Sequence, residues 1–229
     1  MNCELCIDRT EVLLGKTAME RLTKARVAVV GLGGVGGHCA EALARAGVGA
    51  LHLVDGDVFT QSNLNRQLFA TYDTMGAGKP AAAAARIKSF SPCRCTIAHL
   101  YVTEENAAQA LPGDLDYIVD AIDRLSGKLA LARFAHERNI PLLSCMGAGN
   151  RLDAAAFRVT DIFATQGCPL ARRMRQGLRK LGIPALDCVV SEETPTTVEG
   201  ETIGSLAPVT GAAGLVAAAH VIQCVMRNA

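Results

Sequence analysis

The sequence predicts an α/β fold: a Rossmann-like, mostly parallel and doubly wound sheet with helices on both faces and a C-terminal extension. Short apolar, β-branched segments alternate with Ala- and Leu-rich segments, which is the pattern of parallel strands covered by helices. The first apolar segment ends at a glycine-rich turn that opens a helical segment. Half of the 229 residues are hydrophobic and a fifth are charged, so the chain can bury the core that such a sheet needs.

The first half of the chain has the clearest alternation of strands and helices. The run 26–30 has the β-branched composition of a buried strand, and it stops at Gly31. Pro80 precedes an Ala-rich helical segment and is tolerated in the first turn of a helix. The predicted elements are, in order, a strand at 26–30, a helix at 34–46, a strand at 51–54, a helix at 81–87 and a strand near 96–100.

The second half continues the alternation and then becomes irregular. Two buried strands flank a helical segment, and an added strand and a basic helix follow. The Pro, Thr, Glu and Gly content of 182–208 predicts a crossover loop. The other predicted elements are strands at 117–122 and 141–145, a helix at 128–138 between them, a strand at 157–162 and a helix at 169–181.

The segment 205–226 is the one candidate for a membrane-spanning helix. It carries no acidic or basic side chain and is long enough to span a bilayer. Gly211, Gly214, His220 and Gln223 lower its hydrophobicity, however, and the sheet needs a covering helix. We expect a buried or subunit-interface helix rather than association with a membrane.

The charge and cysteine content exclude several classes of protein. The chain has 23 Lys and Arg against 22 Asp and Glu, so contact with nucleic acid must come from a local patch. Its first residues lack the pattern of a signal peptide, and we expect a cytoplasmic protein whose nine cysteines are mostly reduced. Cys3-x-x-Cys6 has metal-like spacing, but no second Cys-x-x-Cys accompanies it. We therefore expect no structural zinc; metal binding at this pair is the alternative to a solvated tail.

A phosphate-binding turn is predicted between the first strand and the first helix. Gly31, Gly33 and Gly36 form a G-x-G-x-x-G motif. In this motif the first glycine permits a tight turn, the second admits a phosphate close to the backbone, and the third allows close helix packing. The helix N-terminus favours an anion, and Asp55 ends the second strand where an acid meets ribose hydroxyls. The alternatives are glycines that only turn the chain, and a nicotinamide dehydrogenase.

Side chains after the second strand favour a nucleoside triphosphate. Asp55-x-Asp57 is followed by Asn63-x-x-Arg66 and then by Lys79. Attack on a triphosphate needs cations because the developing charge and the leaving pyrophosphate must be neutralised, whereas a bound dinucleotide does not need them. Arg66 and Lys79 are therefore candidate phosphate-binding residues. The alternative for each is a surface ion pair.

Taken in order, five motifs resemble the ThiF/MoeB/HesA superfamily of ubiquitin-activating-enzyme-like, ATP-dependent adenylyltransferases. They are the glycine motif, Asp-x-Asp, Asn-x-x-Arg-Gln, Gly-x-x-Lys and Asp-Ala-Ile-Asp. The resemblance runs from about Arg9 to the C-terminal helix. It implies ATP bound by the following residues: Gly31, Gly33 and Gly36 at the turn, Asp55 at the ribose, Asp57 beside it, and Asn63, Arg66 and Lys79 at the phosphates.

The resemblance also implies a metal ion and a second subunit. Asp123 matches the acid that positions Mg²⁺ on the triphosphate, and it follows a buried strand at the sheet edge where ligands of α/β proteins bind. The alternative is a carboxylate that caps the next helix. Arg9 falls where the superfamily has an arginine that reaches the phosphates of the neighbouring subunit, which implies an active homodimer.

Branches of the superfamily differ in the acceptor that they activate. The resemblance to the tRNA threonylcarbamoyladenosine dehydratases is close at residues 147–153, 158–162, 169–179 and 187–193. It implies that the threonine carboxylate of a modified adenosine beside the anticodon is adenylated, and that an internal attack expels AMP and closes a ring. The alternative is activation of the C-terminal glycine of a ubiquitin-like sulfur carrier. A regulatory nucleotide-binding module and a dehydrogenase fit less well, since neither needs the full set of phosphate-binding side chains.

The predicted helix 169–181 is a candidate RNA-binding surface. Leu170, Met174, Leu178 and Leu181 form an apolar stripe at helical spacing, and basic side chains crowd the remaining surface. This cationic face suits a phosphate backbone; the alternative is a solvated helix face. The candidate RNA-binding residues are Arg172, Arg173, Arg175, Arg179 and Lys180.

Cys188 lies in the predicted crossover loop, where some members of the superfamily carry a cysteine that forms a thioester or persulfide. It is a candidate catalytic residue, and the alternatives are packing or contact with a sulfur-transfer partner such as a cysteine desulfurase. The whole chain, 1–229, is predicted as one domain with an N-terminal arm (1–25), a nucleotide-binding core (26–150) and a region for substrate, crossover loop and C-terminal helix (151–229).

Overall fold

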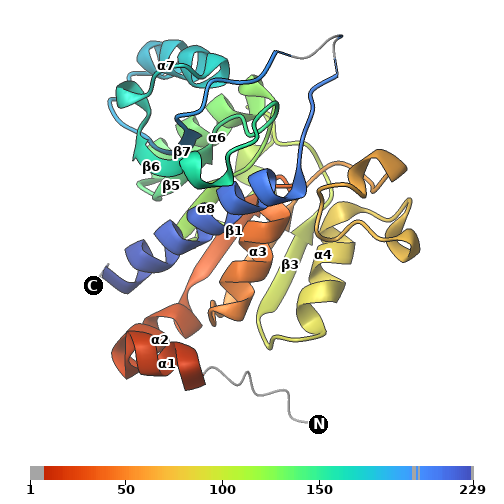
Figure 1. Cartoon of the computed structure of the whole chain (residues 1–229). Coiled ribbons are helices and arrows are strands. Elements are labelled where there is room, and N and C mark those ends of the chain that lie inside the picture. Colours follow the sequence, from red (N-terminus) through yellow and green to blue (C-terminus); the bar gives the residue numbers. More distant parts are fainter. Residues whose placement is uncertain (1–7, 198–199, 201, 228–229) are drawn as a thin grey trace.

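A seven-stranded sheet forms the centre of the computed structural model, which describes residues 8–197, 200 and 202–227 (Figure 1). The strand order is β3-β2-β1-β4-β5-β7-β6, and adjacent strands are parallel except β6 and β7, which are antiparallel. The predicted Rossmann-like fold is therefore confirmed. The strands are β1 (Arg26–Val30), β2 (Ala50–Val54), β3 (Arg94–Ala98), β4 (Tyr117–Asp120), β5 (Leu142–Cys145), β6 (Phe157–Asp161) and β7 (Asp187–Ser191).

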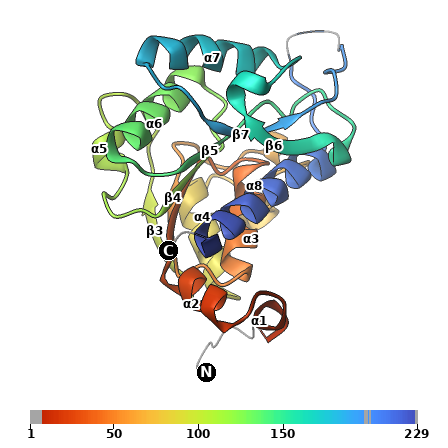
Figure 2. The same cartoon turned by 90° about the vertical axis from the view of Figure 1, so that its left-hand side faces the viewer.

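Helices cover both faces of this sheet in separate layers (Figure 2). In β1, Val27 and Val29 face the core beneath α3, α4 and α8, whereas Ala28 and Val30 face the core beneath α5, α6 and α7. Burial on both faces explains why the strands are apolar throughout instead of alternating with polar residues. The helices are α1 (Asp8–Leu14), α2 (Lys16–Lys24), α3 (Gly36–Arg45), α4 (Lys79–Lys88), α5 (Ala107–Ala110), α6 (Leu125–Arg138), α7 (Pro169–Leu181) and α8 (Ala207–Arg227), with short 3-10 turns η1 (Gln61–Asn63), η2 (Tyr72–Thr74), η3 (Ala154–Ala156) and η4 (Ile162–Ala164).

Two segments differ from the sequence prediction. The predicted loop 182–208 contains β7, which pairs with β5 on one side and β6 on the other. Its short apolar run lies among Pro, Thr and Glu residues, and the strand is specified by the two strands it joins rather than by local composition. The described part of the predicted arm 1–25 folds into α1 and α2, and Met19 and Leu22 of α2 are buried in the core.

The C-terminal helix α8 has the covering role that the sequence predicts. Its contacts are with α3, α2 and the sheet, and Val209, Ala213 and Ala217 are buried among them. A Cβ on Gly214 would lie 2.3 Å from the carbonyl oxygen of Val35, so α8 and α3 approach closely only because this residue is glycine. In the described part of the chain, α8 alone is long and apolar enough to span a membrane, a test that core helices also pass.

Candidate active site

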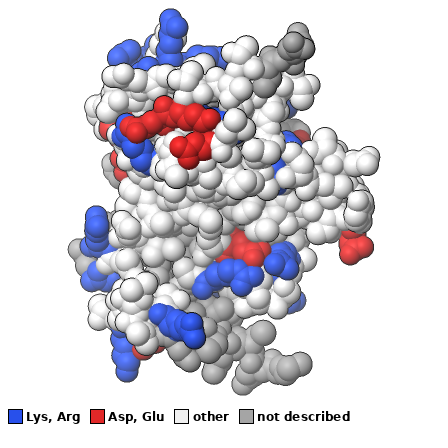
Figure 3. Space-filling model, in the orientation of Figure 1, with Lys and Arg blue, Asp and Glu red and all other residues white. Residues whose placement is uncertain are grey.

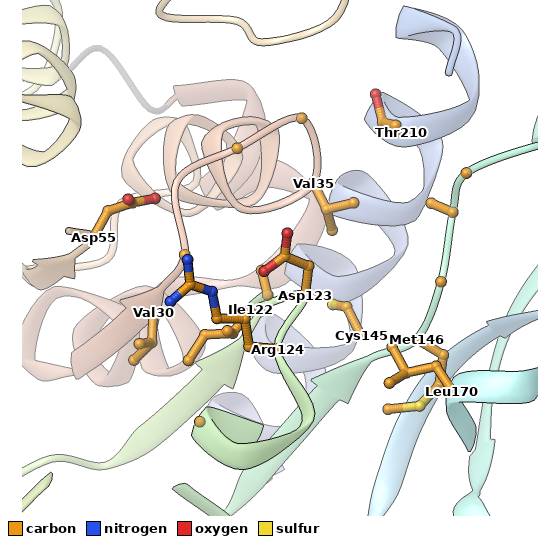
Figure 4. A pocket seen from close by; sticks show the side chains of 18 of the residues that line it. Val30, Val35, Asp55, Ile122, Asp123, Arg124, Cys145, Met146, Leu170 and Thr210 are labelled. Atoms are coloured by element: carbon orange, nitrogen blue, oxygen red, sulfur yellow. The ribbon is translucent and has the colours of Figure 1, made fainter. Parts of the chain in front are cut away.

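A pocket of about 780 Å³ opens where the parallel strands end at their carboxyl termini (Figure 4). It is lined by the glycine turn after β1, Asp55–Asp57 after β2, Asp123 after β4 and the segment 145–151 after β5. This is the edge of an open α/β sheet at which nucleotides bind. The pocket therefore gathers the predicted nucleotide-binding residues from distant parts of the chain.

Gly31 and Gly36 are glycines because the turn leaves no room for a side chain. Gly31 has φ +88°, and a Cβ there would lie 2.6 Å from the carbonyl oxygen of Ala121. A Cβ on Gly36 would lie 1.8 Å from the carbonyl oxygen of Gly31. At Gly33 the nearest atom would be the Nε2 of Gln67 at 3.7 Å, which leaves the backbone open to a ligand. The three glycines thus have the separate roles that the motif predicts.

Asp55 connects the end of β2 to the glycine turn. Its Oδ2 accepts a hydrogen bond from the backbone N–H of Leu32 at 2.6 Å, and its Oδ1 accepts one from the N–H of Asp57 at 2.8 Å. Each carboxylate oxygen has lone pairs left for a ligand hydroxyl. The carboxylate lies at the pocket wall, in the position that meets a ribose in this fold.

Lys79 is a nearly buried cation at the start of α4. Its side chain is 7% exposed, and its Nζ lies 3.0 Å from Oδ2 of Asp57. Tyr101 also donates a hydrogen bond to Asp57. Partial burial raises the pKa of Asp57, but the hydrogen bonds from Tyr101 and Lys79 and the charges of Lys79 and Arg124 outweigh it, so this pKa lies below its usual range. The ion pair holds Lys79 at the pocket wall.

Asn63 and Arg66 approach the pocket from the turn around η1. Asn63 accepts a hydrogen bond from the N–H of Thr60 at 3.1 Å, which fixes its side chain. Nη1 of Arg66 donates to the carbonyl oxygen of Ser62 and to Oδ1 of Asn65, each at 2.9 Å. A guanidinium has five N–H donors, so this anchoring leaves others for a phosphate.

Asp123 lies between the glycine turn and the end of β5, where Cys145 and Met146 begin the neighbouring part of the lining (Figure 4). Its side chain is exposed, and no hydrogen bond to it forms within the described residues. No group of three or more His, Cys, Asp or Glu side chains that could hold a metal occurs in the described ranges. One free carboxylate suits Mg²⁺, which takes one or two carboxylates and completes its shell with substrate phosphates and water.

A buried ion pair beneath the pocket was missed by the sequence prediction. Lys128 of α6 and Asp120 at the end of β4 are both 0% exposed, and Nζ of Lys128 lies 3.0 Å from Oδ2 of Asp120. In the sequence, Asp120 stands out only as the first residue of the Asp-Ala-Ile-Asp motif. The available signal is one lysine in the otherwise apolar run Lys128–Ala132, which belongs to the buried face of the helix.

Arg9 lies apart from this pocket within its own chain. It is exposed on α1, at the end of the molecule opposite the carboxyl ends of the strands (Figure 1). It is not among the residues that line the pocket. Cys3 and Cys6 fall outside the described residues.

The basic residues of α7 have different environments. Nη1 of Arg175 donates to the carbonyl oxygens of Thr165 at 3.0 Å and Ile162 at 3.4 Å, so its guanidinium holds the fold together. The guanidinium of Arg179 lies 5.4 Å from the centre of the Phe163 ring. Arg173 lines the pocket. Arg172, Arg173, Arg179 and Lys180 are exposed, and basic side chains gather at the top of the molecule over α7 in Figure 3.

The structure corrects the prediction that Cys188 lies in a loop. It is in the middle of β7, 0% exposed and absent from the pocket lining. Burial, together with the Asp161 carboxylate and the Cys145 and Cys168 thiols, raises its pKa to about 12. A buried neutral thiol is not a nucleophile, and a sulfur-transfer partner has no surface on which to reach it. These observations favour a packing role for Cys188 over a catalytic or sulfur-transfer role.

A Cys188→Ala variant is therefore expected to keep its catalytic rate within about twofold, because no thiolate is lost. Its free energy of unfolding should fall by about 1 kcal/mol, as is typical for a small change in a core. Steady-state kinetics and urea unfolding measure the two quantities. A loss of activity without a loss of stability would restore Cys188 as a catalytic candidate.

The chain is similar to characterised proteins over most of its length. It is 35% identical over 252 residues to a tRNA threonylcarbamoyladenosine dehydratase of Escherichia coli, with 96% of this chain and 93% of that protein covered. It is 41% identical over 192 residues to the dehydratase of Bacillus subtilis, with 83% and 76% covered. The solved structure of the Escherichia coli dehydratase in complex with ATP superimposes with a TM-score of 0.90 at 36% identity, covering 96% of this chain and 93% of that one.

A sulfur carrier protein ThiS adenylyltransferase of Bacillus subtilis is 36% identical over a shorter stretch of 140 residues, which covers 59% of this chain and 41% of that protein. Residues 8–229 of this chain match the ThiF family. On this match and the 35% identity over nearly the whole chain, the protein belongs to the ThiF family.

Proposed function

We propose that this protein is an ATP-dependent tRNA threonylcarbamoyladenosine dehydratase. The observation that carries the proposal is the pocket in which the glycine turn, Asp55, Arg66, Lys79 and Asp123 meet. It is supported by similarity over 96% of the chain to a dehydratase whose structure contains ATP. The similarity to the ThiS adenylyltransferase covers less of the chain and supports the shared activation chemistry.

In the proposed reaction the threonine carboxylate attacks the α-phosphorus of ATP and pyrophosphate leaves. Lys79 and Arg66 stabilise the negative charge that develops on the phosphates. A nucleophilic atom of the same threonylcarbamoyl group then attacks the activated carboxyl carbon and releases its proton, and AMP leaves with one former carboxylate oxygen. The nucleoside thereby loses the elements of water, and no covalent enzyme intermediate is needed.

Magnesium is part of the proposal, and Asp123 is the residue that would hold it. Bound to the triphosphate, Mg²⁺ would neutralise charge and orient the phosphates. The single carboxylate predicts that Mg²⁺ binds with ATP and not alone. Because the proposed substrate is tRNA, we also propose the cytoplasm as its location.

A homodimer in which Arg9 serves the pocket of the second copy is likewise proposed, because Arg9 lies far from the pocket of its own chain. An equal mixture of the Arg9→Ala and Lys79→Met proteins, each inactive, should recover about a quarter of the wild-type activity, since half of the dimers are mixed and each has one complete pocket. Assays after subunit exchange measure this. If Arg9 acted within its own chain, both pockets of a mixed dimer would be defective and no activity would return.

We propose that the exposed face of α7 contacts the tRNA backbone. Arg175 is left out of this contact because its guanidinium donates hydrogen bonds within the fold. Changing Arg172, Arg173 and Lys180 together to Gln should weaken tRNA binding. The slope of the logarithm of the binding constant against the logarithm of the salt concentration should become less steep by up to about three. Filter binding across a salt series measures the slope. Lys16, Lys24 and Lys88 are exposed on other helices; their triple Gln variant is the charge-matched control and should bind as wild type. An equal effect in both variants would remove α7 from the RNA contact.

The deciding experiment is mass spectrometry of nucleosides from tRNA that contains threonylcarbamoyladenosine, after incubation with the protein and Mg-ATP under mild conditions. The expected result is loss of one water from the modified nucleoside, dependent on ATP and on Asp123. With ¹⁸O in the threonine carboxylate, the label should appear in AMP. An unchanged nucleoside, together with pyrophosphate exchange stimulated by a Gly-Gly-ended carrier, would instead identify a protein acceptor.

A further inference from the structure

Lys128 is a fully buried charged side chain that the proposed reaction does not use. Its Nζ donates to Oδ2 of Asp120 at 3.0 Å, to Oγ of Ser144 at 3.2 Å and to the carbonyl oxygen of Cys145 at 2.7 Å. Ser144 also donates to Oδ2 of Asp120 at 2.5 Å. An ammonium group has three donors, so all of them are occupied.

Stability does not explain this arrangement. Burying two charges costs free energy that their attraction only partly recovers, and a hydrophobic pair of the same volume is often equally or more stable. Lys128 and Asp120 are both 0% exposed, so the full cost of removing them from water applies. The pair therefore requires another explanation, such as holding a specific geometry.

The network joins two neighbouring parts of the pocket lining, at the ends of the paired strands β4 and β5. Oδ1 of Asp120 accepts a hydrogen bond from the N–H of Ile122 at 3.1 Å, immediately before Asp123. Lys128 holds the carbonyl of Cys145, where the segment 145–151 begins. Asp123 and Cys145 lie close to each other at this edge of the pocket in Figure 4.

We propose that Lys128 is a positioning residue, an inference that rests on the proposed function. It sets the distance between two reactants: the triphosphate held at Asp123 and the acceptor carboxylate held at the segment 145–151. The attacking oxygen must approach the phosphorus to about 3–3.5 Å, and a misplacement of about 1 Å costs roughly 10²-fold in rate. Lys128 does not transfer a proton, because it is sealed from the pocket and its three donors are occupied. It acts only through the two parts of the pocket lining that it joins.

The test removes both charges at once. In the Asp120→Asn/Lys128→Met variant no uncompensated charge is buried, so the fold should persist. We expect kcat for AMP formation to fall about 10²-fold. The Kd for ATP should change less than about threefold, because the glycine turn, Asp55 and Lys79 still hold the nucleotide. A wild-type kcat in this variant would overturn the proposal, because a network that only fills space tolerates this replacement.

Two further variants keep the result interpretable. Ser144→Ala removes one member of the network, and we expect a fall in kcat of about tenfold with the fold intact; if the double variant does not fold, a wild-type kcat in Ser144→Ala overturns the proposal. Glu41→Gln disturbs another ion-pair network, with Arg45 and Arg86 near the C-terminal ends of α3 and α4; none of the three lines the pocket, so kcat should stay unchanged. If wild type does not dehydrate tRNA, the proposed function fails, and the same variants are measured in carrier-stimulated pyrophosphate exchange.

Discussion

A Lys79→Met variant is expected to lose about 10²–10³-fold in kcat, the effect of removing one preorganised group that stabilises charge in a transition state. Lys79 is the nearly buried cation at the pocket wall, held 3.0 Å from Asp57. Without it, the Asp57 carboxylate loses its ion-pair partner and repels the phosphates more strongly, so ATP should also bind more weakly. Steady-state kinetics of AMP formation and calorimetric titration with ATP measure the two effects.

The Lys79→Met/Asp57→Asn double variant separates charge balance from catalysis. Removing the unpaired carboxylate should restore much of the ATP affinity, while kcat stays low because no cation stabilises the developing charge. Normal turnover by the single variant would exclude Lys79 from the active site. Recovery of kcat in the double variant would show that Lys79 only neutralises Asp57.

An Asp123→Asn variant is expected to lose about 10³-fold in kcat and most of its dependence on Mg²⁺. The amide keeps the shape of the side chain but removes the charge with which a carboxylate attracts Mg²⁺. Because the side chain is exposed and receives no hydrogen bond from the described residues, thermal stability should stay near that of wild type. Calorimetric titration with ATP, with and without Mg²⁺, measures how strongly Mg²⁺ binding and ATP binding depend on each other.

Wild-type protein should bind ATP more tightly with Mg²⁺ present, and Asp123→Asn should bind it equally in both conditions. The charge-preserving Asp123→Glu variant is the control; it should retain part of the linkage between the metal and the nucleotide. If Asp123→Asn turns over normally and keeps its response to Mg²⁺, then the metal site lies elsewhere.

Elements with strong local signals were predictable from the sequence. β1, the glycine turn and α7 combine composition with stop signals at Gly31 and Gly182, so their positions follow from neighbouring residues. The pocket residues Asp55 and Asp123 were predictable because parallel strands bring their carboxyl ends to one edge. Their roles on ATP and Mg²⁺ stay predictions.

Features created by tertiary contact were not predictable. β7 is a strand because β5 and β6 flank it, and a five-residue run carries too little periodicity to show this. Lys128 looks like an ordinary helix lysine until Asp120 and Ser144 are placed beside it. The charge of α7 was visible, but the direction of the Arg175 guanidinium depends on Thr165, which precedes the helix.

The packing of α8 on α3 also links the nucleotide site to a distant part of the chain. α3 follows the glycine turn near the start of the sheet, yet the helix that covers it comes after all seven strands. Contacts between residues far apart in the sequence form slowly, because the long intervening chain must first be ordered. Until α8 docks, the apolar side of α3 remains open to solvent. A ligand that binds only the native state stabilises only that state, so ATP would favour the chains in which α8 has already docked.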